Sequence, residues 1–487
     1  MRISLISPKW DKMVLTYPPL GLAYLAATLE NSGHQVRIHV FSLSPQSSVE
    51  DNVREVREFC PDIVGITAMT NAYHGAIELA DQIKASIGCP IVLGGPHPTV
   101  LPERTAAEPS VDYVVCGEGE ATLAELVERL EHHGHLEEVQ GLCFKRDGAI
   151  VRTKERALID DLDSLPFPAR HLLDLARFPL RSKSGQPMTT VITSRGCPYD
   201  CSYCFKGIFG RKYRQRSPQN VIAELRTVLQ DSGIRNFYFI DDLFTASVKW
   251  LSEFTQQLIQ EGLDIRWQCL ARVDRVNPGL LQRMRQAGCR EIHYGIESGN
   301  QGILSLVSKH IALEDVERAV RWTKEAGMMT KGYFMIGLPG DTARTTEETM
   351  RLACQLELDE AMFSLTTPFP GTRLWQTLFE SRPDIEFDEA FVRAYYFGLN
   401  GDETKPFLNV SSMSDRKLMA AALAAPKRFE EHRKKQRYMA LCGKRIGLLL
   451  WCLSRIGPLR VIGRMLRKWP RFKRLSGGSS DMARLWT

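Results

Sequence analysis

The feature of this sequence that most restricts its fold is a regular alternation of short β-rich runs with helical stretches, which occurs twice along the chain. The first series fills residues 1 to 140, and its strands are followed by glycines, as in "GGPHPT" and "CGEGE". Strands that alternate with helices form a parallel sheet covered by helices on both faces. We therefore predict an α/β domain of the doubly wound, Rossmann or flavodoxin-like type over residues 1 to 140.

The second series begins after residues 141 to 185, a proline-containing stretch that we interpret as a linker. Over residues 186 to 400 we expect six strands, at 189 to 194, 236 to 240, 266 to 271, 290 to 296, 330 to 336 and 362 to 366. Six β/α units in succession fit an incomplete barrel better than an open sheet. Residues 401 to 487 are basic, and we expect them to be mainly helical.

Chemistry-bearing motifs follow the end of each of these six strands, which is the rim where β/α barrels build active sites. "TSRGCPYDCSYCF" follows the first strand, and "GLPGDT" and "TPFPGT" follow the fifth and sixth. The candidate residues on this rim are, in chain order, Cys197, Cys201, Cys204, Asp241, Asp242, Arg272, Glu297 and Ser298.

The cysteines are expected to be reduced thiols rather than disulfides. The N-terminus "MRISLISPKW" lacks the pattern of a signal peptide, and no apolar run approaches the roughly 20 residues that span a bilayer. A cytoplasmic location follows, and thiols in that compartment serve metals or catalysis. Of the 12 cysteines in 487 residues, only the triad is clustered, and the other nine are interpreted as core thiols.

Three closely spaced thiolates fit an iron-sulfur cluster better than a zinc site. Structural zinc sites usually combine one C-x-x-C pair with a second pair or with two histidines, and no second pair occurs in the sequence. Cys197, Cys201 and Cys204 can instead hold three corners of a four-iron cube. The fourth iron then remains open for chemistry.

"SRGCPYDCSYCF" resembles the CxxxCxxC signature of the radical S-adenosylmethionine (SAM) enzymes. "FYFIDDLFT", "ARVDRV", "AGCREIHYGIESGN", "LVSKHI" and "FMIGLPGDT" look like segments of the subgroup whose N-terminal half binds cobalamin, and the opening of the chain is similar to that subgroup's cobalamin domain. The resemblance covers most of the chain. It implies a [4Fe-4S] cluster, SAM and cobalamin as cofactors.

By this resemblance, the contacts to SAM would come from Asp241, Asp242, Arg272, Glu297 and Ser298. Carboxylates can accept hydrogen bonds from the methionine ammonium group or the ribose, and an arginine pairs with the methionine carboxylate. The chemistry most common in the subgroup uses SAM twice. One molecule methylates cobalamin, and the other yields a 5′-deoxyadenosyl radical that takes a hydrogen from an unactivated carbon of the substrate. That carbon then receives the methyl group from cobalamin, so the resemblance implies methylation of a small-molecule or lipid-like biosynthetic intermediate.

Cobalamin contacts are expected from the two glycine-rich turns, at Gly94, Gly95, His97, Gly117, Glu118 and Gly119. Cobalamin domains that supply a histidine to cobalt carry D-x-H-x-x-G, and none of the 11 histidines follows an aspartate at that spacing. We therefore expect no histidine on cobalt. His97 is interpreted as a loop residue near the nucleotide tail of the cofactor.

Three other functions use some of the same motifs. A cobalamin-binding radical SAM enzyme can form, contract or oxidise a ring without methyl transfer. A transfer-RNA methylthiolating enzyme shares the cysteine triad, but should carry a second cysteine cluster, whereas Cys60, Cys89, Cys116 and Cys143 are widely spaced. An iron-sulfur protein without enzymatic activity, with a basic nucleic-acid arm, is the third. Detection of SAM cleavage would exclude it.

The basic charge is concentrated near the C-terminus. Residues 427 to 474 hold 16 Lys and Arg against two Glu, a local charge of +14, so the remainder of this +6 chain carries 6 − 14 = −8. Basic residues interleaved with Leu, Ile, Trp and Met suit peripheral contact with an anionic membrane, and a helical cap on the barrel is the competing interpretation. Nucleic acid is the least favoured partner. The expected partners are a small-molecule or lipid-like substrate and an electron donor such as flavodoxin or ferredoxin.

Overall fold

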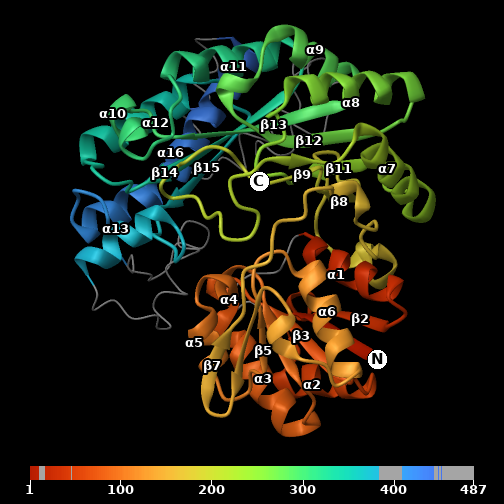
Figure 1. The fold of residues 1–487 in the computed structure, drawn as a ribbon. Helices are drawn as coiled ribbons and strands as arrows, with labels where there is room; N and C mark the ends of the chain where they lie inside the picture. Colours follow the sequence, from red (N-terminus) through yellow and green to blue (C-terminus); the bar gives the residue numbers. More distant parts are fainter. Residues whose placement is uncertain (10–16, 45, 383–407, 444–447, 449–450, 452–487) are drawn as a thin grey trace.

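A computed structural model describes residues 1–9, 17–44, 46–382, 408–443, 448 and 451, and it shows two α/β domains stacked on each other (Figure 1). The N-terminal domain occupies the lower half of this view, and a larger domain built on a second parallel sheet occupies the upper half. The predicted α/β fold class, a doubly wound domain followed by a partial barrel and a helical region, is confirmed.

The N-terminal domain is a seven-stranded sheet in the order β2-β1-β3-β4-β5-β6-β7, parallel over its first five strands. Two separate apolar cores lie on its two faces, one under α1 and α6 and the other under α2 and α3. The elements are β1 (Arg2–Ser7), α1 (Leu20–Asn31), β2 (Gln35–Val40), α2 (Val49–Glu58), β3 (Ile63–Thr67), α3 (Tyr73–Ile87), β4 (Ile91–Gly94), α4 (Pro96–Val100), α5 (Pro102–Ala107), β5 (Tyr113–Val115) and α6 (Gly119–Glu131).

The sheet of this domain continues past residue 140, into the segment predicted as linker. β6 (Leu142–Arg146) pairs antiparallel with β5, and β7 (Ala149–Arg152) pairs antiparallel with β6. The turn between them contains Asp147 and Gly148, both at positive φ, which suits a tight hairpin. The alternation of helix and strand did not predict this hairpin because it adds two strands without a helix.

The second domain is a six-stranded parallel sheet in the order β15-β14-β13-β12-β11-β8, each strand beside the one before it in the chain. Within the described residues β8 and β15 do not pair, so the barrel is incomplete, as predicted. Its elements are β8 (Met188–Val191), β9 (Ser194–Arg195), β10 (Arg214–Gln215), α7 (Pro218–Ser232), β11 (Asn236–Phe239), α8 (Val248–Glu261), β12 (Arg266–Ala271), α9 (Pro278–Gln286), β13 (Cys289–Glu297), α10 (Gln301–Leu306), α11 (Leu313–Glu325), β14 (Met329–Ile336), α12 (Ala343–Gln355), β15 (Glu360–Leu365) and α13 (Arg373–Ser381).

Local sequence sets the ends of the barrel helices. α7 illustrates this, because the Ser217 hydroxyl accepts a hydrogen bond from the backbone N–H of Asn220, Pro218 occupies the first turn, and Gly233 ends the helix at φ 68°. A serine cap of this kind contributes about 1 kcal/mol relative to alanine. These three residues set the boundaries of α7.

The segment between the domains packs on both of them. The backbone N–H of Ala169 donates to the carbonyl of Ala23 at 2.9 Å, and Phe178, 1% exposed, belongs to the N-terminal core. On the barrel side, Arg170 forms an ion pair with Glu224 and donates to the carbonyl of Thr190 at 2.8 Å. Residues 153 to 187 therefore fix the two domains together.

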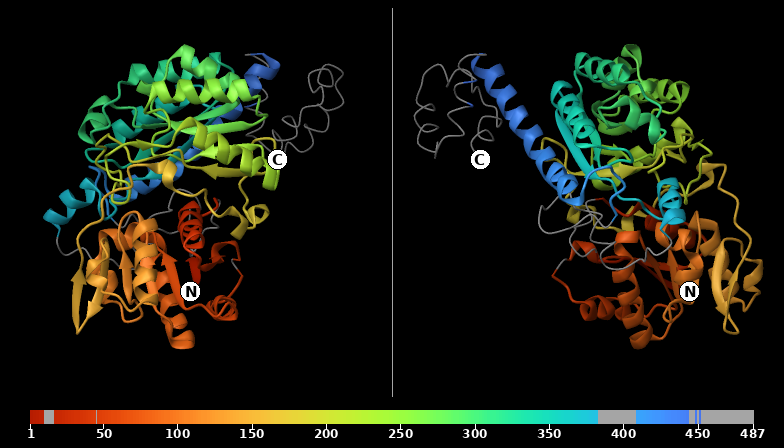
Figure 2. Two further views of the ribbon diagram at one scale, coloured as in Figure 1. Left: turned by 45° about the vertical axis from the view of Figure 1, so that its right-hand side comes forward. Right: turned by 90° about the vertical axis from the view of Figure 1, so that its left-hand side faces the viewer.

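The C-terminal region contains a long helix, α16 (Asp415–Cys442), that runs along the outside of the barrel (Figure 2). Its apolar side contributes Leu418, Ala422, Ala425 and Phe429 to the barrel core, and Arg428 pairs with Glu347 through two hydrogen bonds of 2.7 and 2.8 Å. This part of the basic region is a packed cap. The rest of residues 427 to 474, apart from two positions, lies outside the described residues, and none of the helices described is apolar over a membrane-spanning length.

We predict that α16 stabilises the barrel through Phe429. This ring is 5% exposed and lies 6.1 Å from the ring of Phe363 on β15, centroid to centroid. Phe429→Ala should lower the free energy of unfolding of the barrel by about 3 to 5 kcal/mol, because it leaves a cavity in the core. Urea denaturation followed by circular dichroism measures the change.

Lys417→Ala, on the exposed side of the same helix, is the matched control and should shift stability by about 0.5 kcal/mol or less. Equal stability of the two variants would show that α16 does not support the barrel.

Candidate functional site

The three cysteines lie on the loop that joins β9 to β10, a short antiparallel ribbon at the C-terminal edge of β8. Cys197 and Cys201 are half-buried, and Cys204 is exposed. Gly196 has φ +85°, and a Cβ atom there would lie 2.4 Å from the carbonyl oxygen of Lys212. Only glycine therefore permits the loop to leave the ribbon next to Cys197.

Contacts from two other parts of the barrel hold this loop in place. The backbone N–H of Ser202 donates to the carbonyl of Val307 at 3.0 Å, and the carbonyl of Ser202 accepts from the N–H of Leu374 at 2.8 Å. Arg373 donates to the carboxylate of Asp200 at 2.8 Å. The loop is thus tied to the segment after α10 and to the start of α13.

Arg272 acts on the same loop through Tyr199. Its guanidinium lies 3.6 Å from the centre of the Tyr199 ring, donates twice to Asp274 at 2.9 and 3.1 Å, and donates to the carbonyls of Lys309 and His310 at 3.1 Å each. These partners occupy most of its donor capacity. The structure therefore places Arg272 beside the cysteine loop, as a residue that orients Tyr199.

The donor set of the loop fits an iron-sulfur cluster. Among the residues that the structure describes, no three His, Cys, Asp or Glu groups converge closely enough to hold one metal ion. Thiols that bind three different irons of one cube need not converge on a single point. Although the residue is partly exposed, loss of solvation around its thiol raises the pKa of Cys204 to about 11, with Lys206 acting against this and Asp242, Cys201 and Cys197 adding to it. Binding to iron would reverse the shift by stabilising the thiolate.

The two aspartates after β11 have different surroundings. Asp241 is 1% exposed, and one of its carboxylate oxygens accepts from the N–H of Thr193 at 2.9 Å, its hydroxyl at 2.8 Å and the hydroxyl of Ser194 at 2.6 Å. Burial raises the pKa of Asp241 to about 6, although these hydrogen bonds act in the opposite direction. Asp241 therefore fastens the segment after β8 to the end of β11 through one oxygen, while its other oxygen, Oδ2, is buried with no hydrogen-bond partner among the described residues.

Asp242 is exposed and faces the cysteine loop. Its surroundings raise its pKa through loss of solvation, against the charge of Lys206 and the backbone N–H of Gly196. Its charge in turn raises the pKa of Cys204. Of the pair, Asp242 is the carboxylate that a ligand at the cysteines could reach.

The end of β13 is irregular, and the side chains of Glu297 and Ser298 there have different partners. The pairing of β13 with β14 shifts between Gly295 and Glu297, and Glu297 has φ +70°, a strained value for this residue type. The carboxylate accepts from Lys309 Nζ at 3.0 Å, in a buried pair. Ser298 is 1% exposed, and its hydroxyl lies 3.3 Å from that of Thr349 on α12, so it is engaged away from the loop.

A cavity of about 600 Å³ lies at the C-terminal ends of β1, β3, β4 and β5. Ligands of doubly wound domains bind at this position, where the strand order reverses. Gly94, Gly95, Gly117, Glu118 and Gly119, five of the six predicted cobalamin contacts, line it. Its roof comes from the second domain and includes Ile192, Arg195, Ile208 and Phe209.

The glycine turns leave room for a ligand at the cavity wall. No atom lies within 4 Å of the position that a Cβ atom would take at Gly117, which has φ +75°. A bulky planar cofactor can therefore approach the backbone there, and the cavity fits part of a cobalamin molecule.

His97 does not line this cavity. It is 3% exposed, its Nδ1 lies 3.2 Å from the Thr70 hydroxyl, and its ring lies 4.0 Å from that of Tyr73. Burial lowers the pKa of His97 to about 3, so the ring is neutral. This side chain therefore packs against Thr70 and Tyr73, outside the cavity, and its predicted place near the nucleotide tail stays a prediction.

Glu118 lines the cavity but is also part of a buried ion-pair network between the domains. Its carboxylate accepts from Arg195 at 2.9 Å, from Arg214 at 3.0 and 2.8 Å, and from the N–H of Ile159 at 2.8 Å. Arg195 also donates to Glu120 at 2.5 Å. The network joins the start of α6 to the ribbon that carries the cysteines.

Sequence reasoning missed Glu120, Arg214 and Lys309, and it assigned no role to Arg195. Arg195 and Glu120 lie inside the motifs "SRGCPYDCSYCF" and "CGEGE". Their opposite charges, each beside a glycine, could have marked them as a candidate ion pair. Nothing in the sequence pairs residues more than 70 positions apart, and only the fold brings Arg195 to Glu118.

Two family descriptions match the chain, in agreement with the two domains. Residues 11–127 match the B12 binding domain, and residues 191–353 match the radical SAM superfamily. The cysteine loop and the N-terminal cavity fall within or beside these ranges.

Known proteins resemble the chain over most of its length. An uncharacterized methyltransferase of Pyrococcus horikoshii is 37% identical over 386 residues, which are 77% of this chain and 83% of that one. The anaerobic magnesium-protoporphyrin IX monomethyl ester cyclase of Rubrivivax gelatinosus is 31% identical over 407 residues, 80% of this chain and 72% of that one.

The fold also matches a solved structure. The radical SAM methyltransferase TsrM of Kitasatospora setae, solved with cobalamin and a [4Fe-4S] cluster, has a TM-score of 0.67 at 20% identity, over 78% of each chain. With the sequence relatives and the two matched domains, this similarity leads to one conclusion. The chain belongs to the cobalamin-binding radical SAM enzymes, which use a [4Fe-4S] cluster, SAM and cobalamin.

Proposed function

We propose that this enzyme methylates an unactivated carbon of a small-molecule or lipid-like biosynthetic intermediate. The observation that carries the proposal is that the cysteine loop and the N-terminal cavity share one wall. Arg195, Ile208 and Phe209 line the cavity, and all three belong to or flank the loop that holds the cysteines. A methyl carrier and a source of radicals would thus lie on two sides of one short segment.

The bound cofactors supply the 5′-deoxyadenosyl radical and the methyl group, and the protein supplies binding, orientation and exclusion of water. Cys197, Cys201 and Cys204 would hold the cluster. Asp242 and the Glu297–Lys309 pair, which lie at the strand ends around the loop, are our proposed polar contacts to SAM. Asp241, Arg272 and Ser298 support that site from behind, as their hydrogen bonds indicate.

For cobalamin, we propose contacts from the glycine turns at 94–95 and 117–119, with no histidine on cobalt. None of the described residues that line the 600 Å³ cavity is a histidine, which agrees with the missing D-x-H-x-x-G. His97 would support the turn and not the cofactor.

A ring-forming or ring-modifying reaction without methyl transfer is the second candidate. The cyclase of Rubrivivax gelatinosus, at 31% identity, favours it, and the same loop and cavity would serve both reactions. The greater identity to a protein named as a methyltransferase leads us to place methyl transfer first.

We further propose that an acidic electron donor such as flavodoxin or ferredoxin reduces the cluster in the cytoplasm. Exposed Arg211, Lys212 and Arg373 surround the outer side of the cysteine loop and would attract it. Two of these ion pairs share Asp200, so the local charge stays positive.

Two aspartate variants test the assignment of the SAM site. Asp242→Asn should lower the rate of 5′-deoxyadenosine formation by about tenfold or more, because it removes a charge-assisted hydrogen bond, and each Cys→Ala change in the triad should abolish it. Asp241→Asn should stay close to the wild-type rate. Anaerobic assays with dithionite, with iron content as the control for cluster assembly, separate these outcomes.

The pH dependence of stability gives an independent readout for Asp241. Its pKa in the folded protein, about 6, lies above the unfolded value, so its burial destabilises the fold progressively as pH rises from about 4 to 6. The melting temperature of the Asp241→Asn apoprotein should therefore gain on wild type over that range and stay level above it. A gain that is the same at pH 4 and pH 7 would contradict the role given to Asp241.

The products of SAM distinguish the two candidate reactions. Methyl transfer consumes SAM by both routes, so turnover with substrate should yield S-adenosylhomocysteine and 5′-deoxyadenosine in similar amounts. Chromatography with mass spectrometry measures both. A product of unchanged carbon count, with S-adenosylhomocysteine at background, would favour the ring-modifying reaction.

We also propose reversible contact of residues 427–474 with anionic membrane. Phe429 and Tyr438 of α16 are buried, so the contact would fall to exposed basic side chains and to the residues that follow α16. The full chain should float with vesicles that contain anionic lipid and should dissociate as salt rises, since each basic residue contributes about 1 kcal/mol. A chain ending at residue 443 keeps α16 and should float much less than the full chain, and failure of the full chain to float with anionic vesicles would refute the proposal.

A further inference from the structure

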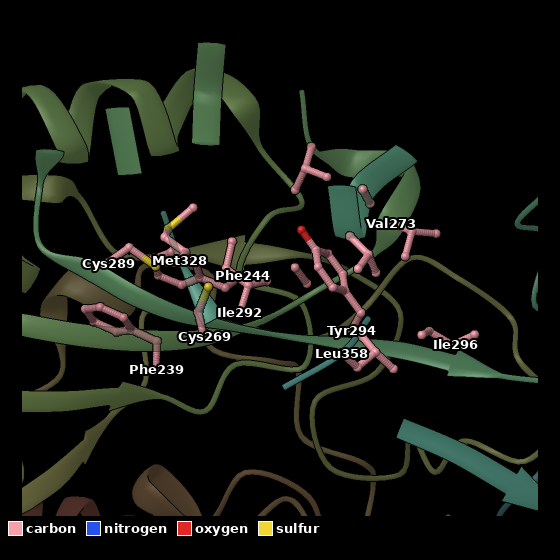
Figure 3. Close-up of a cluster of buried hydrophobic side chains, with 14 of the residues drawn as sticks. Phe239, Phe244, Cys269, Val273, Cys289, Ile292, Tyr294, Ile296, Met328 and Leu358 are labelled. Atoms are coloured by element: carbon pink, nitrogen blue, oxygen red, sulfur yellow. The ribbon is translucent and has the colours of Figure 1, made fainter. Parts of the chain in front are cut away.

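The inner face of the barrel carries a buried polar network that the proposed mechanism has not used. Side chains alternate along β13, so Ile292, Tyr294 and Ile296 enter the outer core, as Figure 3 shows, while Glu291 and His293 point to the opposite face. By the same alternation, Tyr238 on β11 and Tyr333 on β14 lie on the inner face beside His293.

These four side chains form a continuous chain of hydrogen bonds. His293 Nε2 lies 3.0 Å from the Glu291 carboxylate, and His293 Nδ1 lies 3.2 Å from the Tyr238 hydroxyl and 3.3 Å from the Tyr333 hydroxyl. Glu291, His293 and Tyr238 are each 5% exposed or less, and Tyr333 is half-buried. Tyr333 is therefore the end of the chain that remains accessible.

The direction of the hydrogen bonds follows from the carboxylate. Burial alone would raise the pKa of Glu291, but the bond from His293 and the charges of Lys183 and Lys331 bring it below its ordinary value, so the group is an ionised acceptor. His293 must then carry its proton on Nε2. Burial lowers the pKa of His293, so the ring is neutral and Nδ1 is an acceptor.

The two tyrosine hydroxyls share one acceptor and also form a hydrogen bond with each other. Nδ1 has a single lone pair, which accepts a hydrogen bond from one hydroxyl at a time, while two tyrosine hydroxyls lie within hydrogen-bond distance of it. The second hydroxyl can donate to its neighbour or to an oxygen atom that enters the barrel. Apolar side chains would fill this volume without the free-energy cost of burying a carboxylate and an imidazole.

The network also adjoins the cavity of the N-terminal domain. Tyr17, from the segment before α1, lines that cavity, and its ring lies 5.8 Å from the ring of Tyr238, centroid to centroid. The same wall thus runs from the predicted cobalamin site into the barrel. A substrate between cobalamin and SAM would meet it.

We propose that Tyr333, supported by Tyr238, His293 and Glu291, is a positioning residue that binds a hydroxyl or carbonyl oxygen of the substrate. The inference rests on the proposed function for the presence of a substrate in the barrel, but not on methyl transfer itself. It identifies the substrate class as a compound that carries oxygen near the carbon to be attacked.

The test uses reconstituted holoenzyme with SAM, dithionite and, as the probe, the ultrafiltered small-molecule fraction of cells that produce the enzyme. Substrate in this fraction should stimulate 5′-deoxyadenosine formation above the rate with SAM alone. Tyr333→Phe and His293→Gln should keep that basal rate, yet need about tenfold more of the fraction for half-maximal stimulation, since one hydrogen bond to substrate is lost.

Tyr294→Phe is the matched control. It removes a tyrosine hydroxyl from β13, the strand of His293, but this hydroxyl lies 2.8 Å from Thr323 on the outer face, so stimulation should be unchanged. Wild-type stimulation of Tyr333→Phe would overturn the inference, and so would a parallel loss of basal rate and stimulation, which indicates a structural role. If stimulated turnover gives a product without an added carbon, methyl transfer fails while the role of Tyr333 stands.

Discussion

The position of the cysteine loop depends on the buried ion pairs between Arg195, Arg214, Glu118 and Glu120. Removal of one member of such a network leaves an uncompensated buried charge and costs about 3 to 5 kcal/mol. The network joins the ribbon that carries the cysteines directly to the helix start that lines the N-terminal cavity. The distance between the cysteine loop and the N-terminal cavity is therefore set by side chains that contact both.

Next to this ion-pair network, one strand supplies apolar side chains to the core on one face and polar side chains to the other face. β13 places Ile292 and Tyr294 in the apolar core and His293 on the opposite face, and at its end the bulge turns Glu297 toward Lys309. The strain at Glu297, with φ +70°, is of the kind that accumulates at ligand sites. Packing of the outer face holds the strand rigid enough to keep the inner groups in register.

Much of this could be predicted from the sequence, because the signals are local. Five of the six barrel strands begin and end within about two residues of their predicted limits, since glycines, prolines and caps mark their ends. The first strand is shorter than predicted, because Ser194 and Arg195 leave the sheet to form the ribbon with β10. The different surroundings of Asp241 and Asp242 could not be predicted, because two neighbouring carboxylates differ only in the partners that the fold brings to them.

The tightly packed linker has a consequence for how such enzymes can be rebuilt. Ala169 and Phe178 belong to the N-terminal domain by their contacts, while Arg170 is paired with Glu224 of the barrel. The cobalamin domain is therefore not an interchangeable module with a cut site at residue 140. A chimera that takes this domain from a relative would also have to carry the hairpin and the segment up to residue 187, with acidic partners for Arg195, or its two halves would fold without meeting.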